Sequence, residues 1–342
     1  TPYPLATIVW MHNGSPINTS SNRMQLSSNG LRLTLIDLLP SDRGVYTVLV
    51  KNDAGTDSVA FTIGIRVPPI VDMFSTLNST KVFNETISFH GTLKYTPNPP
   101  PTITWLHNGA LIKTSMSRVG LSNDGLSLNL SHLEMSDSGL YTVLINNTVG
   151  SEKVMFFLDV QVPPVVDTVS PSNSLKQFGN GVRFFVTLKR TPRPLPTIQW
   201  SHNGSPINVT ADRVGLSSDG LTLRLSNLMP SDKGEYTILV WNSAGLEVVP
   251  FNLAIQVPPI VQTFSNLNST KLITEHTSFH VNLQYVPNPL PTITWLHNGS
   301  PINTGMSRTE LSSDDLSLNL TDLAVADSGL YTAMIENTIG SE

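Results

Sequence analysis

The stretch WLHNGALI at residues 105–112 decides the fold, because it returns at a fixed spacing along the chain. Near-copies read WMHNGSPI at 10–17, WSHNGSPI at 200–207 and WLHNGSPI at 295–302. The leading tryptophans stand 95 residues apart and are Trp10, Trp105, Trp200 and Trp295. A fixed period of this length is typical of a tandem array, so the chain is predicted to hold about four modules of roughly a hundred residues each.

The composition argues against two classes of protein. Charged residues make up 13% of the 342 residues, the net charge is −5 and no basic stripe is present, so nucleic acid is not expected as a partner. The chain contains no run of 18 apolar residues, so no transmembrane helix is predicted, and no signal-peptide pattern is seen.

Cysteine is absent, which fits either a reducing compartment or an extracellular fold whose disulfide is replaced by apolar packing. Ser, Thr and Asn take the place of charges, and attached glycans would keep such a surface soluble.

Short alternating segments separated by turn signals predict β-strands. In the copy at 69–163, residues 87–95 and 126–133 alternate, and residues 153–162 form the last long strand. The Asn-Gly pair at 108–109 supplies the positive φ that a tight hairpin turn needs. No segment has a sustained helical period, so the fold class is predicted to be all-β, with each module an antiparallel β-sandwich.

Two motifs give the modules a resemblance to a known family. The pattern L-x-Y-x-P-x-P-x-P-x-I-x-W at 93–105 and the segment DSGLYTV at 137–143 resemble immunoglobulin modules, above all the I-set modules of tandem adhesion and muscle proteins. The resemblance covers nearly the whole chain. The positions of the family's two bridging cysteines hold Leu93 and Val143, Leu188 and Ile238, Leu283 and Ala333, and, at the one such position in the first copy, Val48. We therefore expect apolar pairs where relatives carry a disulfide.

The resemblance also implies structural roles for three further sets of residues. The four repeated tryptophans are expected to fill the space between the sheets. A tyrosine corner, in which the hydroxyl bonds to nearby backbone, is expected at Tyr46, Tyr141, Tyr236 and Tyr331. A salt bridge that closes one end of the sandwich is expected to pair Arg23 with Asp42, Arg118 with Asp137, Arg213 with Asp232 and Arg308 with Asp327.

The repeat predicts the domain boundaries. The modules are expected at residues 1–68, 69–163, 164–258 and 259–342, and they are joined by VPPIV or VPPVV segments. Because proline fixes φ, these linkers predict a semi-rigid, extended rod. The first module lacks the counterparts of strands A and B, and the fourth lacks strand G. A segment of a longer chain, or strands supplied by neighbouring chains, would each account for this.

No candidate catalytic, cofactor-binding or metal site emerges from the sequence. His12, His107, His202 and His297 all lie in the HNG turn, and one exposed histidine per module is a poor set of metal ligands. The other strand histidines, His90 and His280, are expected to face solvent. Acidic residues lack the spacing of a calcium loop, and no glycine-rich phosphate loop is present. We therefore predict that the chain is not an enzyme.

The N-glycosylation sequon Asn-x-Ser/Thr recurs along the chain. It occurs at Asn13, Asn18, Asn78, Asn84, Asn129, Asn146, Asn203, Asn208, Asn268, Asn298 and Asn319. Several of these keep register between modules, namely Asn129 with Asn319, Asn78 with Asn268, Asn18 with Asn208, and Asn13 with Asn203 and Asn298. The last three precede Ser-Pro and are expected to be poorer acceptors. N-linked glycans are the one attached group that we expect.

Three functions fit these observations. The first is a secreted or surface-anchored glycoprotein rod, a fibril or an adhesion stalk, whose partners are copies of itself or other cell-surface proteins. The second is the recognition ectodomain of a cell-adhesion receptor, which a large exposed apolar patch on one module alone would favour. The third is an intracellular titin-like structural array, which unmodified sequons would favour. The sequence favours the extracellular rod.

Overall fold

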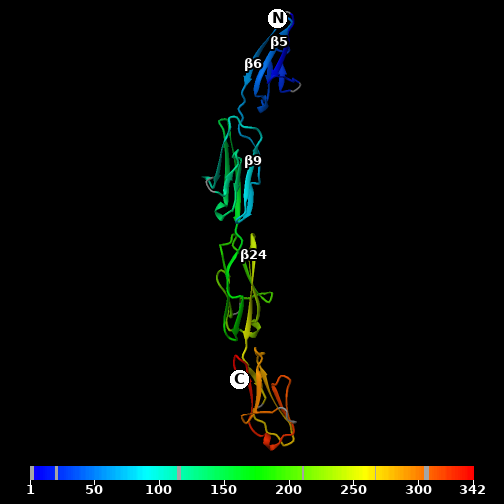
Figure 1. Ribbon diagram of the computed structural model, residues 1–342, viewed down its shortest axis with the longest axis vertical. Helices are drawn as coiled ribbons and strands as arrows, with labels where there is room; N and C mark the ends of the chain where they lie inside the picture. The colour runs from blue at the N-terminus through cyan, green and yellow to red at the C-terminus, as the bar shows by residue number, and fades with distance from the viewer. Residues whose placement is uncertain (1–3, 20–21, 114–116, 210–211, 266, 304–307) are drawn as a thin grey trace. The chain divides into compact units, whose positions relative to one another are not determined.

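The computed structural model describes residues 4–19, 22–113, 117–209, 212–265, 267–303 and 308–342. The chain divides into two compact units, Thr1–Gln161 and Val162–Glu342. Both units are built from β-strands and single-turn 3₁₀ helices, and no α-helix occurs in the described ranges (Figure 1). The 3₁₀ helices are η1 (Pro40–Asp42), η2 (Met135–Asp137), η3 (Pro230–Asp232) and η4 (Val325–Asp327). The chain is therefore all-β, as predicted.

The first unit contains two β-sandwiches of unequal size, whose strands pair antiparallel except for the parallel pair β15 and β8 of the second module. In the first module one sheet has the order β2 (Ser15–Pro16), β1 (Thr7–His12), β5 (Gly44–Asn52), β6 (Gly55–Ile63), and the other pairs β3 (Met24–Leu26) with β4 (Leu33–Leu35). In the second module a five-stranded sheet has the order β11 (Ala110–Leu111), β10 (Thr102–His107), β14 (Gly139–Asn146), β15 (Ser151–Gln161), β8 (Asn78–Val82). Its partner sheet has the order β12 (Val119–Leu121), β13 (Ser127–Leu130), β9 (Ile87–Leu93), β7 (Val71–Phe74).

The second unit repeats this arrangement. In the third module one sheet has the order β17 (Asn173–Gln177), β24 (Gly245–Gln256), β23 (Gly234–Asn242), β19 (Thr197–His202), β20 (Ser205–Pro206), and the other β16 (Val166–Val169), β18 (Val182–Leu188), β22 (Thr222–Leu225), β21 (Val214–Leu216). In the fourth module the sheets have the orders β28 (Ser300–Pro301), β27 (Thr292–His297), β31 (Tyr331–Glu336) and β25 (Val261–Phe264), β26 (Thr277–Leu283), β30 (Ser317–Leu320), β29 (Thr309–Leu311). The boundaries drawn between modules from the repeat stay predictions.

Alternating apolar residues build a core in the second, third and fourth modules. The second module buries Phe89, Trp105, Tyr141, Val143 and Phe156 at 3% exposure or less, and the third buries the equivalent set Phe184, Trp200, Tyr236, Ile238 and Phe251 to the same extent. In the fourth module Trp295, Leu318 and Leu320 are buried, whereas Tyr331 is only half-buried. Trp10 of the first module is half-buried as well.

Apolar side chains occupy the positions where the family carries cysteines. Val143 and Ile238 are fully buried, and Leu93 and Leu188 pack against the same two clusters. In the other modules Val48, Leu283 and Ala333 are half-buried, and Ala333 packs against Trp295. Loss of a disulfide costs about 2–5 kcal/mol, whereas burial of a leucine or a valine contributes roughly 1.5–3 kcal/mol each. The stabilisation expected from each apolar pair is therefore similar in magnitude to the stabilisation lost with the disulfide.

Candidate functional site

The HNG turn ties each hairpin to the core. The His107 ring stacks on the Tyr141 ring at 4.5 Å between centroids, and its Nε2 lies 3.1 Å from the carbonyl oxygen of Ser138. The next residue, Asn108, accepts a 2.9 Å hydrogen bond from the Leu140 amide at its Oδ1. The other three modules repeat the stack at His12, His202 and His297. These histidines serve the fold, and in the described ranges no three His, Asp or Glu side chains gather as metal ligands would.

The Tyr-Asp-Arg group of the second module joins η2, β14 and the residue before β12. Tyr141 Oη donates to the Asp137 carbonyl oxygen at 2.8 Å, and Arg118 contacts the Asp137 carboxylate at 2.5 and 3.0 Å. Burial raises the pKa of the Tyr141 phenol, the Asp137 carboxylate raises it further, and the Arg118 charge partly offsets both. Its hydrogen bond to Asp137 raises the pKa of Arg118 in turn.

The same two contacts occur in the other modules. The tyrosine hydroxyls of Tyr46, Tyr236 and Tyr331 donate to the carbonyl oxygens of Asp42, Asp232 and Asp327. The ion pairs join Arg23 to Asp42, Arg213 to Asp232 and Arg308 to Asp327. Repetition of one saturated network in every module indicates a stabilising group rather than a reactive one.

An asparagine in the turn after the tyrosine strand holds the preceding linker, and we call this contact the linker clamp. Asn147 Nδ2 donates to the carbonyl oxygens of Val67 and Pro99 at 2.8 and 2.9 Å. Its Oδ1 accepts the amides of Val149 and Gly150 at 2.9 and 3.0 Å. Asn242 and Asn337 make the equivalent bonds to Val162 and Val257. This group was not predicted, although an N-x-x-G pattern recurs in the sequence at Asn52, Asn147, Asn242 and Asn337.

The sequon asparagines fall into two structural groups. Those in the HNG turn, Asn13, Asn203 and Asn298, are exposed, have positive φ and have hydrogen-bonded side-chain amides. The others lie on strands, in other turns or in loops, and all are exposed except the half-buried Asn319; they are Asn18, Asn78, Asn84, Asn129, Asn146, Asn208, Asn268 and Asn319. The hydroxyl residues Ser20 and Thr210, which complete the sequons of Asn18 and Asn208, lie outside the described residues. The strand histidines His90 and His280 are exposed.

Apolar side chains are exposed on the outer faces of two sheets. In the second module Leu111, Leu140, Met155 and Phe157 are 41–66% exposed. In the third module Leu246 and Val248 are 59% and 52% exposed. An open hollow of about 570 Å³ adjoins them, lined by Gln199, Leu239, Trp241, Leu246 and the turn 242–245. Exposed apolar side chains also occur on the first and fourth modules, for example at Val45 and Leu330, so they do not distinguish one module, but only the third carries a tryptophan at position 241 or its equivalents.

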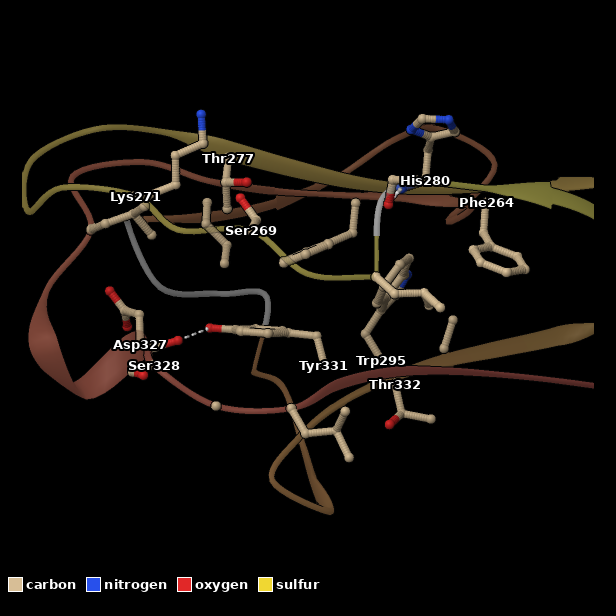
Figure 2. Close-up of a pocket in the computed structure, with 18 of the residues that line it drawn as sticks. Phe264, Ser269, Lys271, Thr277, His280, Trp295, Asp327, Ser328, Tyr331 and Thr332 are labelled. Carbon is tan, nitrogen blue, oxygen red and sulfur yellow. Dashed lines mark hydrogen bonds between the residues drawn. The ribbon is translucent and has the colours of Figure 1, made fainter.

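A pocket of about 720 Å³ lies in the fourth module (Figure 2). Core residues Phe279, Trp295 and Tyr331 line it. In the second and third modules the strands equivalent to β31 pair on their second side with the long strands β15 and β24, whereas β31 pairs in the described ranges with β27 and, on its second side, only through the isolated bridge between Glu336 and Ser341. Figure 2 places His280 across the pocket from Ser328, so these two do not form a nucleophile–base pair.

Three comparisons place the chain among known proteins. A model of the immunoglobulin I-set domain matches residues 1–65, 76–160 and 262–342, and a model of the immunoglobulin domain matches 163–242. Hemicentin-1 of Homo sapiens is 28% identical over 341 residues, which cover 98% of this chain and 6% of hemicentin-1.

Further relatives share the modules. The peroxidasin homolog of Mus musculus is 28% identical over 98% of this chain and 22% of its own length. The cell adhesion molecule DSCAM of Gallus gallus is 26% identical over 96% of this chain and 16% of its own. A solved I-band fragment from titin aligns with a TM-score of 0.51 at 19% identity, over 81% of this chain and 96% of the fragment, which bears on the fold alone. No described helix is long and apolar enough to cross a membrane.

Proposed function

Because the chain belongs to the immunoglobulin I-set family, we propose that it is a non-enzymatic segment of an extracellular structural or adhesion protein. Its modules form a stiff, glycosylated array in this proposal. Support comes from the relatives, which include hemicentin-1 and a cell adhesion molecule. The chain spans only 6% of hemicentin-1 and 22% of the peroxidasin homolog, so the proposal concerns this segment and no activity of the whole proteins.

The linker clamp is the observation that carries the proposal. Three successive modules hold the carbonyl oxygen of the incoming linker through the same asparagine. A second contact acts at two of the joints, where Asn98 and Asn288 donate to the carbonyl oxygens of Ile65 and Ile255 at 2.8 Å. The adjoining prolines restrict φ. A linker fixed in this way supports a semi-rigid array and argues against a flexible tether.

Small-angle X-ray scattering of the whole chain tests this proposal. The 11 residues of β15 span about 36 Å, so four modules in line extend about 145 Å and give a radius of gyration of about 40 Å. A compact protein of this length has a radius of gyration of about 20 Å. A value near the compact one would contradict the array.

A second function, recognition through the third module, is favoured by Trp241. The register of the sheets puts Lys51, Asn146 and Glu336 at its position in the other modules. Aromatic residues are enriched at the centres of protein interfaces. If this face joins copies of the chain side by side, Trp241→Lys should abolish a concentration-dependent increase in sedimentation coefficient, and Lys51→Ala should not. If the two variants sediment identically, this second proposed function is contradicted.

The competing proposal is an intracellular titin-like array. Native material whose sequon asparagines are all unmodified would favour it.

A further inference from the structure

We infer that the folded chain carries N-linked sugar on the exposed strand and loop asparagines Asn78, Asn129 and Asn268, and that the HNG-turn asparagines Asn13, Asn203 and Asn298 stay bare. This inference rests on the proposed extracellular function, because only a chain in the secretory pathway meets the transferase. The sequons look alike in sequence. The inference separates them by the packing and hydrogen bonding of each asparagine side-chain amide in the fold.

In the HNG turn, the side-chain nitrogen to which sugar would be attached already contacts a neighbouring side chain. N-linked sugar is bonded to Nδ2, and in Asn203 this atom lies 3.2 Å from His202 Nε2, while Oδ1 accepts the Glu235 amide at 2.9 Å. A Cβ built on Gly234 would lie only 2.3 Å from Oδ1 and 2.6 Å from Nδ2 of Asn203. The amide is therefore packed against the Gly234 backbone, and a glycan on Nδ2 is incompatible with this packing.

The second module provides a natural comparison. Asn108 has the same φ of 48° as Asn203 and accepts the Leu140 amide at 2.9 Å, yet it is followed by Gly109 and Ala110 and is not a sequon. The turn of the second module thus contains asparagine at this position even though the sequence there is not a sequon and cannot receive sugar. The serines that complete the sequons at Asn13, Asn203 and Asn298 are incidental to the presence of asparagine in the turn.

Asn129 has the opposite surroundings. It is exposed on β13, and its neighbours across the sheet are Gly120 on β12 and Ser88 on β9. The glycine leaves the space beside Asn129 open, since a Cβ there would still lie 3.9 Å from the Asn129 Cβ. The side-chain amide of Asn129 makes no hydrogen bond to any described residue. Asn319, at the same register, faces Glu310 in place of glycine and is half-buried.

Asn78 and Asn268 lie beside exposed apolar residues. Asn78 pairs in register with Phe157, which is 49% exposed, and follows Leu77, which is 53% exposed. Asn268 follows Leu267, which is 81% exposed. A glycan on either asparagine would cover these side chains, which gives the sugar a physical role on a surface where charged residues are scarce.

The test is site-resolved mass spectrometry of the full chain secreted from a mammalian cell line behind an added signal peptide. We expect sugar on Asn78, Asn129 and Asn268 and none on Asn13, Asn203 or Asn298. Sugar on the turn asparagines of folded secreted material, or bare asparagines at all three exposed sites, would overturn the inference. If this material is modified as expected but the native protein is bare, the extracellular proposal fails and the assignment of sites stands.

Two sets of variants separate the packing and hydrogen bonding of the side-chain amide from other causes. Ala110→Ser creates a sequon at Asn108 without the following proline that weakens the natural turn sequons, and we expect Asn108 to stay bare. A glycan there in soluble, folded protein would contradict the argument from packing. Asn129→Gln should remove the mass of one glycan and leave the melting temperature unchanged, whereas Asn203→Gln should leave the glycan mass unchanged and lower the melting temperature.

Discussion

At the scale of single residues, the chain replaces one covalent bond per module with packing and saturates its polar groups. Val143 lies opposite Trp105 in the sheet register, and Ile238 lies opposite Trp200. Each is fully buried, so the tryptophan packs beside an apolar side chain where relatives have sulfur. The Tyr141 hydroxyl donates to the Asp137 carbonyl oxygen, and the Asp137 carboxylate accepts from Arg118 and from the Glu134 amide. Among the described residues no buried side-chain nitrogen or oxygen lacks a partner.

The tyrosine corner predicts a loss of stability in alkali. Burial raises the pKa of Tyr141 and Tyr236, so the folded chain keeps the phenol proton where the unfolded chain, with a pKa of about 10, loses it. Above about pH 10 the folded state then binds more protons, and the contribution of these tyrosines to the free energy of unfolding, fully present below that pH, is lost as pH rises further. Urea unfolding at about pH 8 and about pH 11 measures this decline.

The matched variant is Tyr141→Phe. It should cost the second module about 0.5–1.5 kcal/mol near neutral pH through the lost bond to Asp137, and it should flatten that module's alkaline decline. An equally steep decline in the variant would show that Tyr141 is not responsible.

At the scale of strands and turns, the alternation of side chains predicted the two-sheet modules, and the Asn-Gly pairs predicted the hairpin turns. Strands β8 and β17 were not predicted, because each is short and mostly polar and pairs in parallel with a strand that follows much later in the chain. The linker clamp was missed for a similar reason. It joins Asn147 to a carbonyl oxygen 80 residues away, and in sequence such an asparagine looks like an ordinary turn residue.

The clamp gives a prediction at this scale. Asn147→Ala removes two donated and two accepted hydrogen bonds, so the amides of Val149 and Gly150 should exchange hydrogen faster and the second module should lose about 1–3 kcal/mol. The control is Asn146→Ala, at an exposed neighbour, which should change stability by less than about 0.5 kcal/mol. Equal protection of the two amides in both variants would contradict a role for the clamp.

At the scale of the whole chain, repetition distinguishes structure from function. The tyrosine corner, the ion pair and the HNG turn occur in all four modules, as expected of groups that each sandwich needs to fold. Features confined to some modules, such as Trp241 and the sequon at Asn129, are better candidates for contacts with partners or sugars. The repeat period alone predicted the groups common to all modules. The module-specific features could be singled out only once the exposure of each side chain was known, and periodicity does not reveal exposure.

The central claim is that each module is a sandwich in which apolar pairs stand where relatives carry a disulfide. The most direct measurement is on the double variant Leu188→Cys with Ile238→Cys, oxidised and digested for mass spectrometry. The account predicts one intramolecular bridge between positions 188 and 238 and a raised melting temperature for the third module. Two free thiols after oxidation of the folded protein would contradict it.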